Sequence, residues 1–357
     1  WLVGRESAEP YCRGATVELL DGDAPFRLRF LFDSWSGWRT AYERLREARI
    51  DVVALRSPTD QYLVMSGRSL FRGMTFDQLV RAQIDIETLT LDPQAQDAEI
   101  IIMTASVNGQ SPLVLRADEV PEPDMLDALT GWIRDLDPDV IEGHNLFNFD
   151  IPYLLARASH HGRTLAWGRD GSPLRLGREQ RFKAGARSVP FQSAYVYGRH
   201  IVDTYQQIQR YDTGGELESY GLKPALIALG LSRTHRTYVE GPAIAAAWKH
   251  EREDLVRYAI DDALDVNTVS ELALPTEFYQ AQILPRSLQS VATGGPGEKI
   301  NDLLIRAYVA VGRSLPSPSQ PEDYPGGYAE LRRTGRFSPV VKCDVESLYP
   351  SIMLADN

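Results

Sequence analysis

The sequence lacks the features that mark secreted, membrane-spanning or disulfide-stabilised proteins. Its two cysteines, Cys12 and Cys343, lie far apart and form no CxxC pattern, which allows one disulfide at most and favours a reducing compartment. No run of about 18 apolar residues could cross a membrane, and no charged segment followed by an apolar one opens the chain as a secretion signal. We therefore expect a cytoplasmic protein without a membrane partner, and the missing initial methionine suggests a fragment or absent first residues.

An excess of basic residues is also missing. The 357 residues include 38 Lys and Arg against 49 Asp and Glu, a formal net charge of −11. This argues mildly against nucleic-acid binding, which favours basic surfaces. A net charge hides local patches, however, and a cluster of metal-binding carboxylates would add to the acidic excess. The length suggests two or three domains, and a hydrophobic content of 43% is enough for a globular core.

Residues 1–78 predict a small α+β domain without a chemical motif. The alternation in Phe26–Phe32 is typical of a half-buried strand, Thr40–Ala48 predicts a helix, and Tyr62–Met65 predicts another strand.

From residue 79 onward, β-rich segments are followed by alternating strands and helices. Strands are expected at Ala82–Thr90, Ile100–Val107, Pro112–Arg116 and Val140–Glu142, and the turn Asn108-Gly109 predicts a hairpin. Helices are expected at Asp124–Leu136 with Asp124 as its cap, Ile151–Ala158, Leu222–Leu229 and Glu251–Leu272. Arg199–Ile208 predicts a strand that runs into a helix. This order predicts an α/β fold with a mixed sheet flanked by helices.

The last part of the chain is expected to contain several loops or linkers. Residues 292–297 and 314–327 are rich in Gly, Pro and Ser and predict loops or linkers, with the end of a helix expected at Arg306–Gly312 between them. An apolar strand is expected at Pro339–Cys343, directly before Asp344–Leu354.

Asp85 and Glu87 form the first acidic motif, D-x-E, on an expected strand. Residues i and i+2 of a strand point to the same face, so both carboxylates would project together. Two carboxylates make a hard oxygen site suited to Mg²⁺ or Mn²⁺. The alternative is a solvated strand face, because D-x-E also occurs at Asp97–Glu99 and Asp344–Glu346.

Asp150 ends the second motif, N-x-x-x-F-D, between an expected strand and an expected helix. It could be a helix N-cap, a metal ligand at the end of the sheet, or both. Asn145 could orient the backbone or a substrate. Phe149 is a candidate substrate contact or a core residue.

Tyr258 and Asp262 form the third motif, Y-x-x-x-D. Residues i and i+4 of a helix share a face, so the two side chains would lie one above the other while Asp261 points to solvent. The alternative is an amphipathic helix with a surface acid.

Together and in this order, the three patterns resemble the exonuclease motifs of the DEDD superfamily, tyrosine subtype, as found in family B DNA polymerases. The bacterial DNA polymerase II kind is the relative that we expect. The segments around the motifs are similar as well, over Gly143–Arg157, Gly198–Tyr205 and Ser219–Leu231. His144 stands where the family more often has an aromatic residue.

Asp344–Ile352 (DVESLYPSI) resembles motif A of the polymerase palm. The resemblance implies that Asp344 holds catalytic metal and that Tyr349 shapes the sugar pocket. Two further motifs of the family, K-x-x-x-N-S-x-Y-G and a metal motif with D-T-D, are not in the sequence. We therefore expect no nucleotide polymerisation from these residues alone, and dNTP binding only in a full-length polymerase.

The resemblance implies four parts. They are an N-terminal α+β domain (1–78), an RNase H-like 3′→5′ exonuclease domain (79–276), a linker or helical connection (277–335) and the start of a palm domain (336–357).

The resemblance also implies a chemistry that uses two divalent cations, Mg²⁺ or Mn²⁺. Asp85 would bridge the two metals, and Glu87 and Asp262 would help hold the one that activates water. Asp150 would hold the other, mainly through water. Tyr258 would place its hydroxyl near the attacking water or the scissile phosphate.

The implied substrate is the 3′ end of single-stranded DNA or a frayed primer–template, which gives a role in DNA replication or repair and, in a prokaryote, a place near the nucleoid. Candidate DNA contacts are Phe147, Phe149 and the basic stretch Arg169–Arg187, although both phenylalanines could be core residues and the stretch a flexible loop. The sequence leaves open whether a processivity factor binds the chain. The alternatives are a stand-alone DEDD nuclease, against which the palm motif argues, and an inactive nucleic-acid-binding domain.

Overall fold

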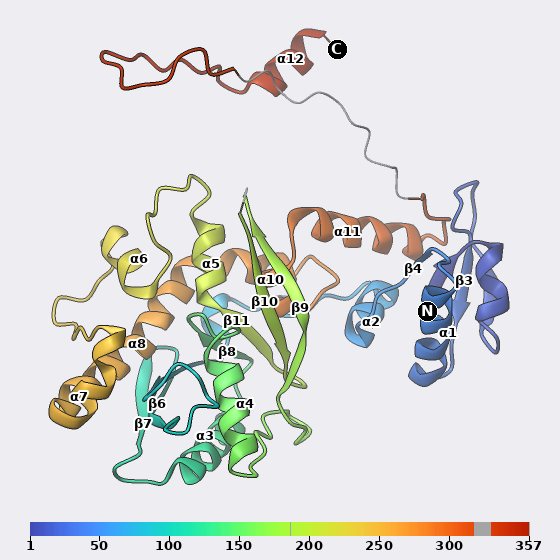
Figure 1. The fold of residues 1–357 in the computed structure, drawn as a ribbon. Helices are drawn as coiled ribbons and strands as arrows, with labels where there is room; N and C mark the ends of the chain where they lie inside the picture. The colour runs from blue at the N-terminus through green and yellow to red at the C-terminus, as the bar shows by residue number, and fades with distance from the viewer. Residues whose placement is uncertain (186, 318–329, 357) are drawn as a thin grey trace. The chain divides into compact units, whose positions relative to one another are not determined.

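A computed structural model describes residues 1–185, 187–317 and 330–356 of the chain (Figure 1). It divides into two compact units, Trp1–Ser317 and Pro318–Asn357. Among the described residues, no helix combines the length and the apolar character needed to cross a membrane.

The first unit opens with a small antiparallel sheet in the order β2-β3-β1-β4. Its strands are β1 (Leu2–Gly4), β2 (Thr16–Leu19), β3 (Leu28–Leu31) and β4 (Val52–Val53), with the 3-10 helix η1 (Glu6–Tyr11) between the first two. Helix α1 (Trp35–Glu47) begins after Ser34, whose Oγ accepts a hydrogen bond of 3.1 Å from the Gly37 N–H. The strand expected at Phe26–Phe32 and the helix expected at Thr40–Ala48 are confirmed, as β3 and α1.

The strand expected at Tyr62–Met65 is wrong, because this segment belongs to helix α2 (Pro58–Ser66). Ser57 caps the helix and Pro58 occupies its first turn, where proline favours a helix start. Leu63 and Val64 are both buried, which is a helical rather than an alternating pattern.

A mixed five-stranded sheet forms the centre of the unit, in the order β11-β8-β5-β6-β7. It consists of β5 (Arg81–Thr88), β6 (Ile100–Val107), β7 (Gln110–Arg116), β8 (Val140–Gly143) and β11 (His200–Asp203). β11, β8 and β5 are parallel, whereas β6 and β7 pair antiparallel. Asn108 and Gly109 both have positive φ and close the hairpin that the sequence predicted. The mixed α/β fold is therefore confirmed.

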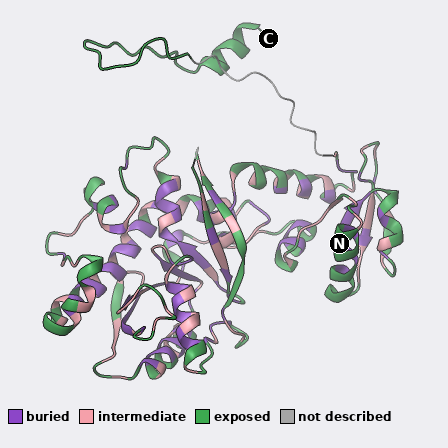
Figure 2. Cartoon of the chain, in the orientation of Figure 1, coloured by how far each residue is buried: buried purple, intermediate pink, exposed green. Residues whose placement is uncertain are grey.

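Helices cover both faces of this sheet, and its strands other than β7 are largely buried (Figure 2). On one face, helices α3 (Glu122–Leu136) and α4 (Asp150–His160) pack over Ile84 and Ile86. On the other face, the long helix α8 (Arg252–Ala273) contacts β5, β6, β7 and β8. Because side chains alternate along a strand, Asp85 and Glu87 lie on the α8 side.

The cap predicted for α3 is wrong. Asp124 lies in the first turn of this helix, and the N-cap is Pro121.

A long two-stranded hairpin, β9 (Arg175–Ala184) and β10 (Arg187–Tyr195), stands beside the sheet. A flexible loop was one expectation for this basic stretch, and it is wrong, because pairing extends from Arg187↔Ala184 to Tyr195↔Arg175. Most residues of the two strands are exposed, so the sequence shows no regular apolar alternation there.

Further helices complete the first unit: η2 (Phe76–Gln78), α5 (Thr204–Tyr211), α6 (Leu222–Ala228), η3 (Gly241–Ala243), α7 (Ile244–His250), α9 (Pro275–Ala281), α10 (Leu288–Thr293) and α11 (Pro296–Ala310). The loop expected at residues 292–297 is mostly wrong. Only Gly294 and Gly295 separate α10 from α11, and Pro296 starts α11.

In the second unit, helix α12 (Leu348–Asp356) is the only element that the structure describes. The strand expected at Pro339–Cys343 is wrong, because these residues are exposed and pair with no described strand. Asp344 and Tyr349 are also exposed. Residues 318–329, which hold most of the Pro-rich linker prediction, lie outside the described residues.

Candidate metal centre

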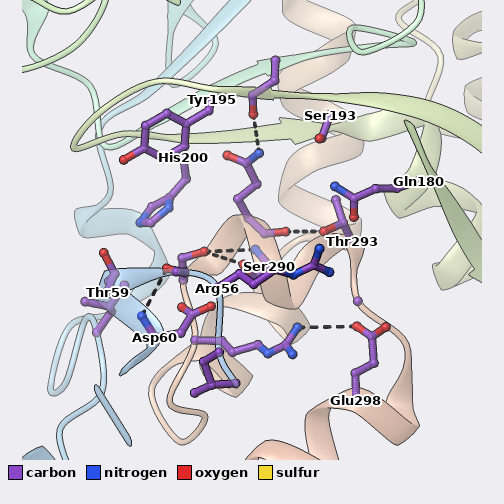
Figure 3. Close-up of a pocket in the computed structure, with 18 of the residues that line it drawn as sticks. Arg56, Thr59, Asp60, Gln180, Ser193, Tyr195, His200, Ser290, Thr293 and Glu298 are labelled. Atoms are coloured by element: carbon purple, nitrogen blue, oxygen red, sulfur yellow. Dashed lines mark hydrogen bonds and ion pairs between the residues drawn. The ribbon is translucent and has the colours of Figure 1, made fainter. Parts of the chain in front are cut away.

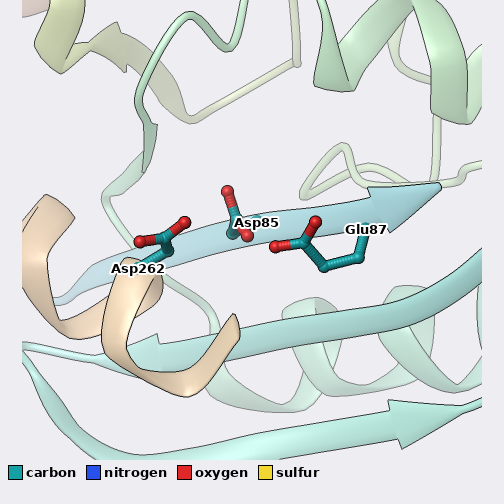
Figure 4. A group of neighbouring side chains, drawn as sticks. All are labelled: Asp85, Glu87 and Asp262. Carbon is teal, nitrogen blue, oxygen red and sulfur yellow. The ribbon is translucent and has the colours of Figure 1, made fainter. Parts of the chain in front are cut away.

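Three carboxylates from two distant parts of the chain meet between β5 and α8. Asp85, Glu87 and Asp262 each offer an oxygen atom, and these oxygens lie within 4.8 Å of one another. Figure 4 shows Asp85 and Glu87 on the strand, with Asp262 reaching toward them from the helix. The spacing of a strand and the position of α8 over it therefore bring the first and third sequence motifs together.

Burial and mutual repulsion disfavour the charged forms of the clustered carboxylates. Burial, followed by the charges of Glu87, Asp262 and Asp150, raises the pKa of Asp85 well above its usual value. Burial and Asp262 likewise raise the pKa of Glu87. Oδ2 of Asp85 is buried without a hydrogen-bond partner among the described residues. Carboxylates that repel each other and an oxygen without a donor fit a hard divalent cation, which prefers oxygen ligands.

Asp150 is the first residue of α4 and is buried beside this cluster. It is not the helix N-cap, a position taken by Phe149. Burial and the nearby carboxylates of Asp203 and Asp262 raise the pKa of Asp150 to about 7. Its oxygens lie outside the group of three, but its charge contributes to the raised pKa of Asp85. The four predicted carboxylates therefore share one electrostatic environment.

A buried carboxylate that the sequence did not single out, Asp203 at the end of β11, shapes the loop before Asp150. It accepts hydrogen bonds from the backbone N–H groups of Asn145 (2.8 Å), Phe147 (3.1 Å) and Tyr205 (3.0 Å). Burial raises the pKa of Asp203 to about 6, against the effect of these donors. Its location in the segment similar to the family was the one sequence signal that could have identified it.

The aromatic residues of this loop are less available to a ligand than expected. Phe147 is fully buried in the core, so its proposed contact with DNA is wrong. Phe149 is half-buried, packs against the same core, and lies 5.7 Å from the Tyr153 ring between centroids. His144 is held by Thr204 Oγ1 and the Tyr220 carbonyl oxygen at 3.0 and 2.9 Å, and burial lowers its pKa to about 3.

Tyr258 and Asp262 lie on the buried side of α8, where a lysine joins them. Lys223, at the start of α6, donates a hydrogen bond to the Tyr258 hydroxyl, and its Nζ lies 3.3 Å from Oδ2 of Asp262. Burial and the nearby acids raise the pKa of Tyr258, so its hydroxyl stays protonated. Lys223 is a cation at the site that pattern reasoning missed, because a single lysine carries no motif.

Asp261 does not point to solvent as expected. It accepts a hydrogen bond of 2.8 Å from the Thr237 N–H and pairs with Arg233 at 3.0 Å. Arg236 lies between these residues and the cluster, and its side chain pairs with both Asp262 and Asp265. The segment after α6 is therefore attached to the acidic side of α8 by several ion pairs.

A second feature, a cavity of about 1640 Å³, lies away from the carboxylates. Figure 3 shows it between Arg56, Thr59 and Asp60 on one side, Gln180, Ser193 and Tyr195 on the hairpin, and Ser290, Thr293 and Glu298 on α10 and α11. Four cations of the basic stretch line it: Arg169, Arg178, Arg181 and Lys183.

Several cations that line this cavity have no ion-pair partner among the described residues, and Arg56 and Arg178 are two of them. Within residues 1–185, 187–317 and 330–356, neither Arg56 nor Arg178 makes an ion pair, and burial together with Arg56 lowers the pKa of Arg178. Tyr195 and Tyr197 are both about half exposed on the same wall. Unpaired cations beside exposed aromatic rings are typical of a surface that holds a single nucleic-acid strand.

The sequence was compared with known families and proteins. Residues 117–224 match the family described as DNA polymerase family B, exonuclease domain. The chain is 27% identical over 339 residues to DNA polymerase 1 of Pyrococcus abyssi, covering 88% of the chain and 42% of that protein. It is 25% identical over 348 residues to the DNA polymerase of Archaeoglobus fulgidus, covering 95% and 41%. The chain thus spans about two fifths of the length of these relatives.

The fold is similar to the structure of the family B DNA polymerase from the hyperthermophilic archaeon Pyrobaculum calidifontis. The TM-score is 0.68 at 20% identity, and the match covers 91% of this chain and 47% of that one. These three relatives are archaeal, so the narrower expectation of a bacterial DNA polymerase II kind is not supported.

Proposed function

This chain carries the N-terminal and exonuclease region of a family B DNA polymerase, and from this premise we propose that it hydrolyses 3′-terminal nucleotides of DNA in a metal-dependent, proofreading reaction. The observation that supports this activity most directly is the group of three carboxylate oxygens within 4.8 Å. The buried, unpartnered Oδ2 of Asp85 adds to it.

Asp85, Glu87 and Asp262 are the residues that would hold the cations, with Asp150 contributing mainly through water. When bound, a pair of divalent cations supplies an activated water and relieves the negative charge that develops on the leaving oxygen. Figure 4 shows Asp85 between Glu87 and Asp262. By the resemblance, Asp85 would be the ligand that both cations share.

Tyr258 and Lys223 are placed to act on the scissile phosphate or the attacking water. The Tyr258 hydroxyl, protonated at neutral pH, can donate a hydrogen bond to a phosphate oxygen. Lys223 holds that hydroxyl and adds a positive charge beside Asp262. This pair would orient the phosphate, whereas the carboxylates carry the cations.

The DNA contacts that we propose lie in two places. Asn145, in the left-handed backbone region at φ 65°, and the half-buried Phe149 are candidates at the 3′ end. Arg56 and Arg178 would hold phosphates of a single strand in the cavity of Figure 3, where Tyr195 offers a ring for base stacking.

Nucleotide addition is not part of the proposal for this chain alone. Asp344 and Tyr349 would serve as metal ligand and sugar-pocket residue only together with the two further polymerase motifs, which the 357 residues do not contain. We also propose the four parts 1–78, 79–276, 277–335 and 336–357 as working domain boundaries.

The test is incubation of the purified chain with a 3′-mismatched primer–template and Mg²⁺, with EDTA and Asp85→Asn as controls. We expect stepwise shortening from the 3′ end that is lost in both controls. A folded protein that shortens no primer in Mg²⁺ or Mn²⁺ would argue for an inactive DNA-binding region. Shortening that Asp85→Asn retains would place the activity elsewhere. An RNA primer of the same sequence, run in parallel, tests whether the sugar matters.

A further inference from the structure

Arg236 is an almost fully buried cation at the edge of the candidate metal centre, with its side chain 1% exposed. Its guanidinium donates from Nη2 to Oδ1 of Asp262 and from Nε to Oδ2 of Asp265 at 2.5 Å. The third nitrogen, Nη1, donates to the Thr237 carbonyl oxygen at 2.8 Å. Each nitrogen therefore has a different acceptor, and only one of these acceptors belongs to the metal centre.

The two oxygens of Asp262 differ in the cations that they meet. Oδ1 pairs with Arg236, whereas Oδ2 lies 3.3 Å from Nζ of Lys223. The side chain of Lys223 is 24% exposed. Its flexible aliphatic stem allows the ammonium group to move away from Asp262. The planar guanidinium of Arg236, held at three points, cannot move without breaking buried hydrogen bonds.

Asp265 explains why a positive charge can stay so close to a cation site. This fully buried carboxylate, one turn further along α8, pairs with Arg236 and also accepts hydrogen bonds from Arg233 at 3.1 and 3.2 Å. Much of the Arg236 charge is therefore already compensated before Asp262 is considered. Arg236 therefore acts on Asp262 both by its charge and by fixing the position of Oδ1.

We propose that Arg236 is a positioning residue that fixes Oδ1 of Asp262 and thereby leaves Oδ2 as the oxygen that binds the divalent cation, with Lys223 as the side chain that gives way. This proposal rests on the function proposed above. Arg236 touches neither substrate nor reacting atoms and acts through Asp262, with Asp265 as its anchor.

Binding of Mn²⁺ to the full chain, followed by the electron paramagnetic resonance signal of the free ion, tests this without any turnover. We expect Arg236→Gln to weaken Mn²⁺ binding about tenfold or more, because Asp262 can then rotate away from the cluster. Arg236→Lys should weaken it as well, since one ammonium group cannot hold Asp262, Asp265 and the Thr237 carbonyl together. This second variant keeps the buried charge and serves if Arg236→Gln does not fold.

Arg233→Gln is the matched control. Arg233 lies on the same segment and binds the same Asp265, but it makes no contact with Asp262. We expect its Mn²⁺ affinity to stay within about twofold of the unmodified chain. Asp265→Asn should weaken Mn²⁺ binding like the Arg236 variants, because it releases the anchor.

The outcomes separate this proposal from the function on which it rests. If Asp85→Asn abolishes Mn²⁺ binding but folded Arg236 variants bind Mn²⁺ as tightly as the unmodified chain, the positioning role is overturned and the metal centre stands. Tighter binding in Arg236→Gln would overturn it too, since Arg236 would then be a competitor of the cation. If the unmodified chain binds no Mn²⁺ at all, both proposals fail.

Discussion

The carboxylate of Asp203 accepts a hydrogen bond of 2.8 Å from the backbone N–H of Asn145. This contact joins the end of β11 to the loop that follows the parallel neighbour β8. Asn145 has a φ of 65°, a left-handed conformation that an asparagine tolerates better than most residues. The loop that leads into Asp150 is therefore held by a side chain from another strand.

We predict that Asp203→Ala lowers the free energy of unfolding by about 3 kcal/mol. The substitution leaves three backbone N–H groups in and around a buried loop without their acceptor, and each unsatisfied buried group costs roughly 1–3 kcal/mol. Urea denaturation measures the change. Asp203→Asn keeps one acceptor oxygen and should lose less, so equal losses in the two variants would contradict this explanation.

Divalent cations should stabilise the chain through the carboxylate cluster. At a Mg²⁺ or Mn²⁺ concentration of about one hundred times the dissociation constant, binding to the folded state adds roughly 2.7 kcal/mol. A thermal melt with and without the cation should show a rise in Tm that Asp85→Asn abolishes. Asp97→Asn, in the other D-x-E pattern before the palm segment, is the control and should respond like the unmodified chain.

Tyr258→Phe should lower the rate of 3′-end hydrolysis by about 10- to 100-fold, which corresponds to roughly 1.4–2.7 kcal/mol of transition-state stabilisation. The ring and its packing on α8 remain, and only the hydroxyl beside Lys223 is lost. Mn²⁺ affinity should be unchanged, which separates this effect from damage to the metal centre. Tyr238→Phe is the control. It removes a hydroxyl that forms a hydrogen bond with Ser232 at the surface, and the rate of hydrolysis should not change.

We predict that Asp60 contributes to the free energy of unfolding at low pH and that this contribution falls as pH rises. Burial raises its pKa to about 6, and its Oδ1 is buried without a hydrogen-bond partner among the described residues. A carboxyl group that binds its proton more tightly when folded adds stability at low pH, and this contribution is lost as pH rises through about 6.

Asp60→Asn should therefore be more stable than the unmodified chain at pH 8, by about 2–3 kcal/mol at most, and the advantage should disappear near pH 4. Denaturation at both pH values checks this. A gain that is the same at pH 4 and pH 8 would show that Asp60 does not titrate as its burial implies.

Arg178→Gln should weaken binding of single-stranded DNA and reduce the slope of log affinity against log salt by about 0.7, the contribution of one phosphate contact. Fluorescence anisotropy with a labelled oligonucleotide at several salt concentrations measures both quantities. Arg46→Gln, on the exposed side of α1 outside the cavity, is the charge-matched control. Equal effects of the two substitutions would mean that the net charge and not the cavity governs binding.

Local patterns carried most of the information that the sequence could give. Asp85 and Glu87 could be placed on one strand face because alternation is a local property, and Asn108-Gly109 predicted its hairpin because the turn type depends on those two residues. Tyr258 and Asp262 could be paired by helical spacing. The ordered similarity of the three motifs was what joined them into one expected site.

The residues that were missed depend on contacts between distant segments. Asp203, Lys223 and Arg236 belong to none of the three motifs, and their partners lie on other strands and helices. The β9–β10 hairpin escaped notice because most of its side chains face solvent on both sides. In the segment Pro58–Ser66, β-branched and aromatic residues favoured a strand locally, but the Ser57-Pro58 start and tertiary packing favour the helix.

The candidate centre needs carboxylates from β5 and from α8, which lie at nearly opposite ends of the central fold in chain order. A chain emerging from the ribosome can therefore complete the sheet and both of its early helices and still lack Asp262, one of the three clustered carboxylates. At about 5–20 residues per second, the interval before Asp262 is made is on the order of ten seconds or more. If the proposed activity requires Asp262, nascent chains and fragments that stop before α8 are expected to leave DNA 3′ ends intact.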